Sequence, residues 1–491
     1  MNWSFKKTVL TGATVALCAG TLAGCGSLQG DKQKAKGKDG EETILMYKVG
    51  DKPKSYDKTM DYINEKMKDE LGVKLNIQYI GWGDFDKKMQ VITSSGEDYD
   101  IAFANSFASN AQKGAYADLT ELAPKYAKET YENLDPAYIK GNTINGKLYA
   151  MGVNANVFAQ TMFTFPKALI DKYNFDLSTV KTLADLEPML ETIKEKEPQL
   201  TTIAAGQGLR IGRNIDYVFD NNFPVAVDIN GDKTKIINPF ESSDTLKEDL
   251  ATMHKFYEKG FVPKDAATSN TEYNLKDNTW FMRLETQGPF DYGDSLLTQA
   301  AQRELISVPM TKPLKSNAQA RVANYVVSST SKKKEKALEV INLINTDPDI
   351  LTTMVYGLEG DTWKKLDNDR MEVTDKYDAQ NVISGAWMTG DNSKLYINKN
   401  ITDEQIKERD ASIKEAEESP LLGFNLDTSN IKTEITNISN VSNQYLAGLH
   451  TGTLDPEKAV PEFNEKLKKA GIDKVIKEVQ TQYDAFLKEK K

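Results

Sequence analysis

The sequence predicts an α/β protein of two lobes with a helical C-terminal part. Three observations support this. A chain of 491 residues is too long for one hydrophobic core. Strand patterns alternate with helix patterns in two successive series, before and after about residue 149. From about residue 431 the apolar residues follow helical spacing almost throughout.

The first series reads as the beginning of an open parallel sheet. The expected elements are a strand at 44–49, a helix at 56–71, a strand at 73–79, a helix at 84–91 and a strand at 100–105. Gly72 is suited to end the first helix, and Asp84 can cap the second. Alternation of this kind places helices between neighbouring parallel strands.

The second series repeats the alternation less regularly. We expect strands near 161–165, 201–204, 278–284 and 304–308, and helices through residue 172 and at 183–196. In the C-terminal part, apolar residues from Phe463 to Phe486 lie on one helical face or on two helices separated by a break at Gly471.

The first residues indicate a secretory leader that ends in a lipid attachment site. Lys6 and Lys7 precede a short apolar stretch, and Leu22-Ala-Gly-Cys25 is the lipobox pattern of bacterial lipoproteins. We expect a leader over 1–24, lipidation of Cys25 and a position on the extracellular face of the cell membrane. The alternative is an ordinary leader with an incidental cysteine. Residues 25–42 are poor in apolar side chains and are predicted to be a flexible tether.

Charge and cysteine content exclude several functions. The net charge of −10 becomes −12 once the two leader lysines are removed. An acidic surface argues against nucleic acid and against adsorption to anionic lipid, so acyl chains would hold the protein at the membrane. The only other cysteine, Cys18, lies in the leader, which leaves the folded part without a thiol for a disulfide, a zinc site or a nucleophile.

Polar and aromatic residues follow several predicted strands. In open parallel sheets, ligands bind at the carboxyl ends of the strands. Trp82, between two glycines, follows one strand, and Asn105 and Ser106 follow another. Gln287 and Tyr292 follow a later strand. Rings that cover the C–H faces of a sugar, with amides for its hydroxyls, favour a neutral sugar ligand. We assign Trp280 and Trp363 to the core.

Common catalytic and metal-binding motifs are absent from the sequence. It has no Gly-x-Ser-x-Gly elbow, Walker loop, Cys-x-x-Cys or His-Glu-x-x-His, so we expect neither an enzyme nor a cofactor. A glycosidase stays possible, because carboxylate pairs cannot be located among 72 acidic residues. The Asp228–Asp232 segment lacks part of a calcium loop and is predicted to be a hairpin turn at Asn230-Gly231, without metal.

Several segments resemble the family 1 extracellular solute-binding lipoproteins of carbohydrate ABC importers. The similar segments are 98–104 with 114–122, the hairpin 145–151, the helix end 254–262, the returning strand and helix at 328–345, and 420–424 before the helical tail. No one of these segments is diagnostic of the family, but their order along the chain is. Over the whole chain the sequence is most similar to streptococcal lipoproteins that serve an N-glycan importer.

The resemblance implies a periplasmic-binding-protein-like fold with lobe 1 at 43–152 plus 310–348 and lobe 2 at 153–309 plus 349–491. It implies an oligosaccharide ligand of host N-glycan type, ABC permease partners and a monomer. The cleft would gather Trp82, Asn105 and Ser106 from lobe 1, and Asn154, Asn156, Tyr217, Gln287, Tyr292 and Trp387 from lobe 2. A glycan-binding adhesin and a peptide-binding transport receptor are the alternatives to this function.

Overall fold

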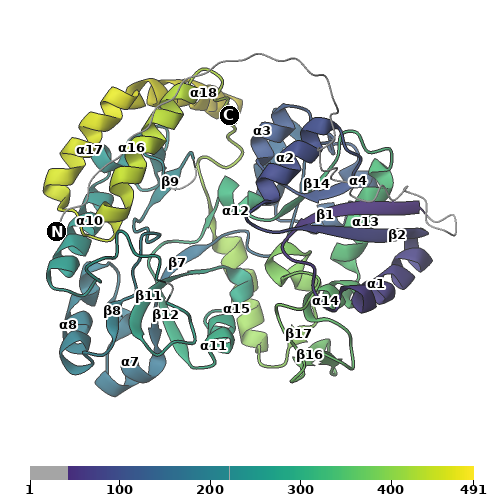
Figure 1. Cartoon of the computed structure of the whole chain (residues 1–491), viewed down its shortest axis with the longest axis horizontal. Helices are drawn as coiled ribbons and strands as arrows, with labels where there is room; N and C mark the ends of the chain where they lie inside the picture. Colours follow the sequence, from purple (N-terminus) through teal and green to yellow (C-terminus); the bar gives the residue numbers. More distant parts are fainter. Residues whose placement is uncertain (1–41, 220–221, 272, 491) are drawn as a thin grey trace, which may run out of the picture.

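The computed structural model describes residues 42–219, 222–271 and 273–490. It contains two α/β lobes side by side, with α12 (Asn317–Arg321) and α15 (Asp403–Glu415) between them (Figure 1). Each lobe has a hydrophobic core of its own. The predicted two-lobed α/β fold is therefore confirmed. The leader, Cys25 and nearly all of the expected tether lie outside the described residues.

The sheet of lobe 1 has the strand order β2-β1-β3-β14-β6. The strands are β1 (Glu42–Val49), β2 (Val73–Ile80), β3 (Ile101–Phe103), β6 (Met151–Gly152) and β14 (Asn324–Val327). β1 pairs in parallel with β2 and β3, whereas β14 is antiparallel to β3 and to β6. The first series of predicted elements is thus present, and its parallel strands end at one edge of the sheet.

The helices of lobe 1 bury their apolar faces against this sheet. They are α1 (Tyr56–Leu71), α2 (Phe85–Ser95), α3 (Phe107–Gln112), α4 (Ala123–Tyr126), α5 (Lys128–Asn133), α6 (Pro136–Asn142), α13 (Lys334–Thr346) and α14 (Pro348–Tyr356). In α1 the buried residues Met60, Ile63 and Met67 follow helical spacing. Gly72 ends α1 at φ 67°, where its N–H donates to Lys68 O. This left-handed position favours glycine, as expected from the sequence.

The sheet of lobe 2 has the order β12-β7-β11-β8. Its elements are β7 (Gln160–Pro166), β8 (Thr201–Ile203), β11 (Trp280–Gln287), β12 (Leu305–Pro309), and the helices α7 (Lys167–Tyr173), α8 (Glu187–Lys196), α9 (Pro239–Ser242), α10 (Asp244–Glu258) and α11 (Ser295–Ala301). β7 is antiparallel to β11 and β12, whereas β8 is parallel to β11. The two lobes therefore differ in how their strand ends are arranged.

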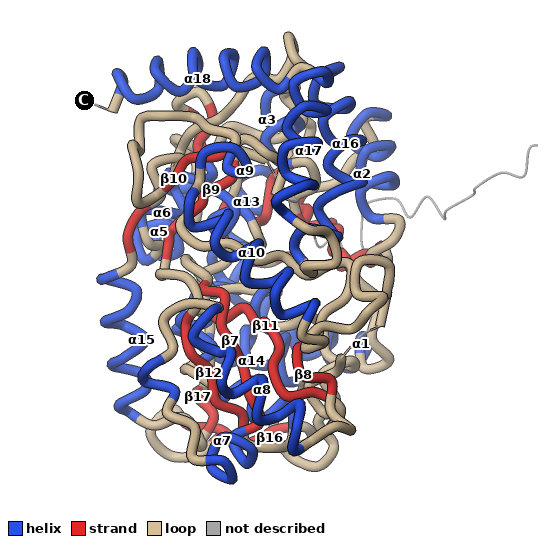
Figure 2. Tube along the Cα trace, turned by 90° about the vertical axis from the view of Figure 1, so that its left-hand side faces the viewer, coloured by secondary structure: helices blue, strands red, loops and turns tan. Residues whose placement is uncertain are grey.

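The C-terminal helices complete the core of lobe 2. They are α16 (Lys432–His450), α17 (Pro456–Ala470) and α18 (Ile472–Glu489), and they lie at one end of the molecule (Figure 2). Phe463 of α17 packs edge-on against Phe240, with ring centroids 5.2 Å apart. Gly471 separates α17 from α18 at φ 100°, which confirms the predicted break.

Short elements lie around the two sheets and between the lobes. They are β4 (Thr143–Ile144), β5 (Lys147–Leu148), β9 (Ile215–Tyr217), β10 (Ala226–Asp228), β13 (Leu314–Lys315), β15 (Trp363–Lys365), β16 (Arg370–Val373), β17 (Ile397–Asn398) and β18 (Glu417–Glu418). The chain passes between the cores near residues 159–162, 311–319 and 416–425.

The expected division between the lobes differs from the structure in two places. Lobe 2 was expected to begin at residue 153, whereas Val153, Ala155, Val157 and Phe158 are buried in the core of lobe 1. Residues 349–491 were assigned to lobe 2, whereas Ile350, Leu351 and Met354 of α14 are buried in the core of lobe 1. The passage to lobe 2 comes later, at 416–425, where Leu422 enters the first core and Leu421 the second. The cause is the apolar face of α14, which continues the packing of α13.

Candidate ligand-binding site

Trp82 and Trp387 form an exposed pair of stacked rings, which we call the tryptophan pair. Trp82 lies two residues after the end of β2, and Trp387 lies in the short 3-10 turn η4 (Ala386–Met388). Their ring centroids are 6.2 Å apart at an interplanar angle of 21°. The two side chains nevertheless stay 61% and 42% exposed. Two nearly parallel indole rings open to solvent can accept a flat apolar ligand face.

The segment that carries Trp387 is fixed to lobe 1, although it was predicted to belong to lobe 2. Ile383 and Met388 are buried in the first core. The hydroxyl of Tyr79 donates to Ile383 O at 2.6 Å. Asn154 Nδ2 donates to Asp391 Oδ1 at 2.8 Å, and the N–H of Asn392 donates to Asn154 O at 2.8 Å. Asn154 therefore supports the Trp387 segment, and both rings of the pair belong to one lobe.

Asn105 and Ser106 lie at the carboxyl end of β3, as expected. Asn105 is buried, and its side-chain and backbone oxygens accept from the Tyr116 hydroxyl at 3.1 and 2.8 Å. Among the described residues, no partner accepts from its amide nitrogen. Ser106 is exposed and has φ 43°, a left-handed conformation that is costly for a serine. Ser106 is thus the accessible member of the two.

The candidate residues at the end of β11 and in the loop after it bond to other protein groups, both within lobe 2 and across to lobe 1 and α15. Gln287 Nε2 donates to Asp294 Oδ1 at 2.7 Å and to Ser307 Oγ at 3.2 Å. The Tyr292 hydroxyl accepts from Arg409 Nη1 at 3.0 Å. Asn156 Oδ1 accepts from the N–H of Phe290 at 3.4 Å. These contacts order the loop that follows β11, so its shape is fixed by the side chains that were expected to contact a ligand.

Tyr217 and the core tryptophans lie in more apolar surroundings. Burial raises the pKa of Tyr217 to about 12, and its hydroxyl is closed off from solvent in this conformation. Trp280 is fully buried, and its indole N–H donates to Asn274 O at 2.9 Å. Trp363 is likewise buried, with its N–H donated to Gly357 O. The assignment of both tryptophans to the core is confirmed.

Lobe 2 has a polar hollow that sequence analysis missed. It has a volume of about 400 Å³ and is lined by residues that include Gly206, Gln207, Asn270, Tyr273 and Arg283. It lies where β8 ends beside its parallel neighbour β11. The rule that selected Trp82 would also have selected Gly206 and Gln207, had it been applied to the strand at 201–204.

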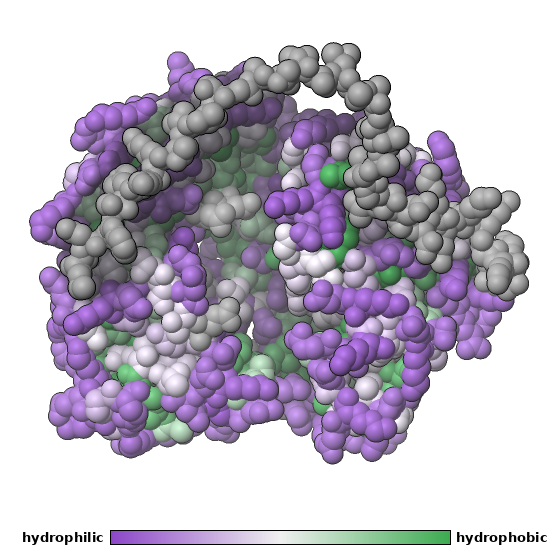
Figure 3. Space-filling view, in the orientation of Figure 1, coloured by the Kyte–Doolittle hydropathy of each residue, from purple (hydrophilic) through white to green (hydrophobic). Residues whose placement is uncertain are grey.

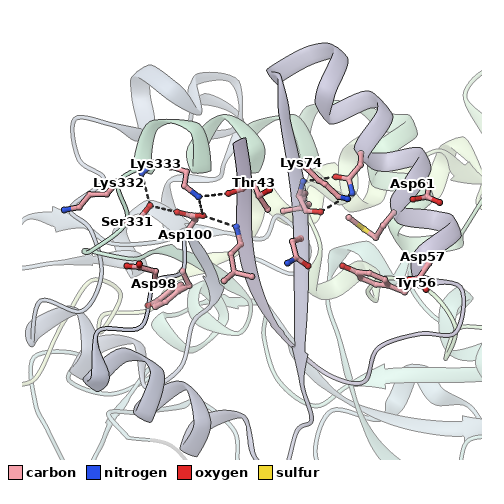
Figure 4. Close-up of a pocket in the computed structure, with 16 residues that line it drawn as sticks. Thr43, Tyr56, Asp57, Asp61, Lys74, Asp98, Asp100, Ser331, Lys332 and Lys333 are labelled. Atoms are coloured by element: carbon pink, nitrogen blue, oxygen red, sulfur yellow. Dashed lines mark hydrogen bonds and ion pairs between the residues drawn. The ribbon is translucent and has the colours of Figure 1, made fainter. Parts of the chain in front are cut away.

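A larger hollow of about 730 Å³ lies at the opposite edge of the lobe 1 sheet, where the parallel strands begin. Figure 4 shows Ser331 and Lys333 turned toward Asp100 at one side of the hollow. Asp100 accepts from Leu45 N at 2.9 Å, from Ser331 Oγ at 2.6 Å and from Lys333 Nζ at 3.0 Å. Because this network is satisfied within the protein and lies at the amino ends of the parallel strands, this hollow is a weaker candidate for a ligand site than the tryptophan pair.

The loop after β10 uses its carboxylate for a turn. Asp228 Oδ1 accepts from the N–H groups of Asn230 and Gly231 at 2.9 and 3.1 Å. The expected two-residue hairpin is replaced by a longer loop, because Ala226 bridges to Ile237. Within residues 42–219, 222–271 and 273–490, no group of three acidic, histidine or cysteine side chains is arranged to hold a metal. Over the same ranges no helix is long and apolar enough to cross a membrane.

The surface is hollowed between the two lobes (Figure 3). Exposed rings stand on lobe 1, and a polar hollow lies at a strand end of lobe 2. Two α/β lobes with several connections and residues of this kind at their strand ends define a bilobed binding protein.

Comparison with known proteins agrees with this class. Residues 61–358 match the model of the bacterial extracellular solute-binding protein family, and residues 420–488 match a domain of unknown function, DUF3502. The chain is 48% identical, over all of both chains, to a carbohydrate ABC transporter substrate-binding protein of Streptococcus pneumoniae serotype 4. The chain belongs to the bacterial extracellular solute-binding protein family.

The solved structures that this chain resembles are also solute-binding proteins. The crystal structure of the N-glycan transport solute binding protein NgtS from Streptococcus pneumoniae matches 91% of this chain and 100% of its own, with 49% identity and a TM-score of 0.89. The complex of NgtS with Man5GlcNAc matches 91% of this chain and 99% of its own, with a TM-score of 0.77. The family membership makes this chain an extracellular solute-binding protein and supports the prediction that it is not an enzyme.

Proposed function

We propose that this protein captures an oligosaccharide of the N-glycan type between its lobes and delivers it to the permease of an ABC importer. The observation that carries this proposal is the tryptophan pair, two stacked and exposed rings on lobe 1. Aromatic faces of this kind pack against pyranose rings, while neighbouring amides and hydroxyls bind the sugar hydroxyls. Ser106 on lobe 1 and Gln207 on lobe 2 are suited to that second task.

The relatives support the ligand class. NgtS, 49% identical to this chain, has been solved with Man5GlcNAc. A branched glycan needs a cleft with contacts on both walls. The polar hollow beside Gln207 and Asn270 supplies a second wall without a formal charge cluster, which suits a neutral ligand.

Closure of the lobes is part of the proposal. The TM-score is 0.89 for the NgtS structure named without a ligand and 0.77 for the Man5GlcNAc complex. A hinge rotation lowers such a whole-chain score even when each lobe keeps its fold. These values support an open conformation here, in which the ring faces stay exposed until a ligand enters.

Attachment to the membrane through Cys25 completes the proposal. Cys25→Ala is expected to release the protein from membranes or to leave an unprocessed precursor, because the acyl chains supply the anchoring free energy. Membrane fractionation with lipid labelling measures this. A Cys25→Ala protein that stays in membranes and still takes up lipid label would contradict it.

Titration calorimetry of the purified mature protein tests the main function. We expect tight binding of Man5GlcNAc, weak binding of malto-oligosaccharides and of peptides, and recovery of the glycan intact. Preferential peptide binding would favour a peptide receptor, and cleaved glycan would favour a glycosidase. Growth on the glycan that persists after deletion of the permease would favour an adhesin. Each of these three outcomes would overturn the proposal.

A further inference from the structure

Lys48 is a buried lysine beneath the segment that carries Trp387. In β1 the buried positions alternate, and Lys48 shares the core-facing row with Ile44 and Met46. Its side chain is only 1% exposed. Within the part of the chain that the structure describes, no carboxylate forms an ion pair with it. Burial lowers the pKa of Lys48 to about 7. A charge in such a place is costly, and a methionine of similar length would pack there without that cost.

The Lys48 ammonium group is directed at one backbone carbonyl. Lys48 Nζ donates to Met388 O at 3.1 Å and also contacts the Tyr325 hydroxyl. That hydroxyl donates to the same Met388 O at 2.6 Å. The ammonium further lies 4.8 Å from the centre of the Tyr325 ring. Two donors from β1 and β14 thus converge on the residue that follows Trp387.

We propose that Lys48, with Tyr325, is the positioning residue that holds Trp387 in stacking contact with Trp82. The two donors fix the end of η4, while Tyr79 and Asn154 fix the segment on either side. The two donors add to the hydrogen bonds that the Thr389 and Asn392 side chains make to Gly385 O and Ala386 O in the same turn. A protonated amine donates more strongly than a neutral group. Lys48 itself does not contact the ligand. Its effect on binding rests on the proposed function of the tryptophan pair.

The tests use Lys48→Met, which keeps the chain length and removes the donor, and Tyr325→Phe, which removes the second donor. Lys333→Met is the matched control, because Lys333 also donates to a backbone carbonyl of lobe 1, that of Thr43, but at the opposite edge of the sheet (Figure 4). The readout is near-ultraviolet circular dichroism without ligand. For each protein, the spectrum of the same protein carrying Trp387→Ala is subtracted, and the difference reports the stacking of the two indoles.

We expect Lys48→Met to lose most of this signal and to bind Man5GlcNAc about tenfold more weakly. Lys333→Met should change neither quantity. In a Trp387→Ala background, Lys48→Met should cause less than about a twofold further loss, because both changes remove the same contact. The last comparison separates positioning from a general loss of stability.

Two results would overturn the inference. One is an unchanged dichroism signal in Tyr325→Phe and in Lys48→Met; if Lys48→Met fails to fold, Tyr325→Phe alone decides. The other is a tenfold loss of glycan affinity that Lys48→Met also causes in the Trp387→Ala background. If wild-type protein does not bind the glycan, the proposed function fails, whereas the ligand-free signal still decides whether Lys48 positions Trp387.

Discussion

Lobe 1 and lobe 2 use the ends of their strands in different ways. In lobe 1, the residues that follow β2 and β3 are accessible to a ligand, since Trp82 and Ser106 are exposed. In lobe 2, Gln287 at the end of β11 is hydrogen-bonded to Asp294 of the following loop and to Ser307 of β12. The same rule about strand ends therefore selected accessible residues in one lobe and mainly loop-forming residues in the other.

Strand direction explains this difference. β1, β2 and β3 are parallel and lie side by side, so their carboxyl ends meet at one edge of the sheet, and antiparallel β14 enters only beside β3. In lobe 2, β7 runs antiparallel to both of its neighbours, so the chain turns back beside the end of β11. The hollow near Gln207 lies where β8 ends beside β11, and these two strands are parallel to each other. Candidate residues are thus best chosen after the direction of each strand is known.

The largest expected effect contrasts tryptophans of the two lobes. Trp280→Ala removes a fully buried ring of lobe 2 and should lower the free energy of unfolding by about 3–5 kcal/mol through cavity formation. Trp82→Ala should change the melting temperature little, because its ring is largely exposed. Thermal unfolding of both variants measures this. Equal losses of unfolding free energy in the two variants would show that Trp82 is as much a core residue as Trp280.

The second effect concerns ligand affinity. Trp82→Ala and Trp387→Ala each remove a stacking surface, which should cost about 1–3 kcal/mol of binding free energy. This corresponds to a dissociation constant about 5- to 150-fold weaker. Calorimetric titration with the glycan measures it. Wild-type affinity in both variants would show that the ligand contacts some other surface.

The third effect is smaller and sharpens the comparison between loops. Gln287→Ala breaks hydrogen bonds to Asp294 and Ser307 and should lower the unfolding free energy by about 1–2 kcal/mol with little change in affinity. Gln207→Ala, the matched change in the hollow, should weaken glycan binding and leave stability nearly unchanged. A reversed pattern in denaturant unfolding and titration would place the ligand at the β11 loop.

The last effect, small for each single pH unit, is a difference in pH dependence between the lobes. Burial lowers the pKa of Lys48 in lobe 1 to about 7 and raises the pKa of Asp216 in lobe 2 to about 6. Above pH 7 the unfolded state holds the Lys48 proton that the folded state has lost, so stability rises with pH up to about 10.5. Between about pH 4 and 6 the folded state holds the Asp216 proton instead, so stability falls as pH rises.

Denaturant unfolding across pH measures both slopes, each at most about 1.4 kcal/mol per pH unit. Relative to wild type, Lys48→Met should remove the rise above pH 7, and Asp216→Asn should remove the fall below pH 6. Identical pH profiles for wild type and variants would show that the two groups are not buried as described.

Local patterns predicted the elements better than the contacts between them. The strands at 44–49 and 73–79, the helix end at Gly72 and the break at Gly471 were all expected, because apolar spacing and glycine act over a few residues. The stacking of Trp82 on Trp387 depends on how distant segments pack, which no local pattern contains. Lys48 was also missed, because hydropathy alone favours solvent for a lysine, whereas this one meets Met388 O and Tyr325.

The segment at 416–425 has a consequence for how the chain can be divided. Leu421 and Leu422 are adjacent in sequence but buried in different cores. The second family match begins at residue 420, within the segment that contributes residues to the cores of both lobes. Helices α16 to α18 supply Tyr445, Phe463 and Val475 to the core that also holds Phe240 and Leu246. The tail therefore matches a domain model of its own yet completes the core of lobe 2, and a protein shortened at this boundary would uncover apolar residues such as Phe240 and Leu246.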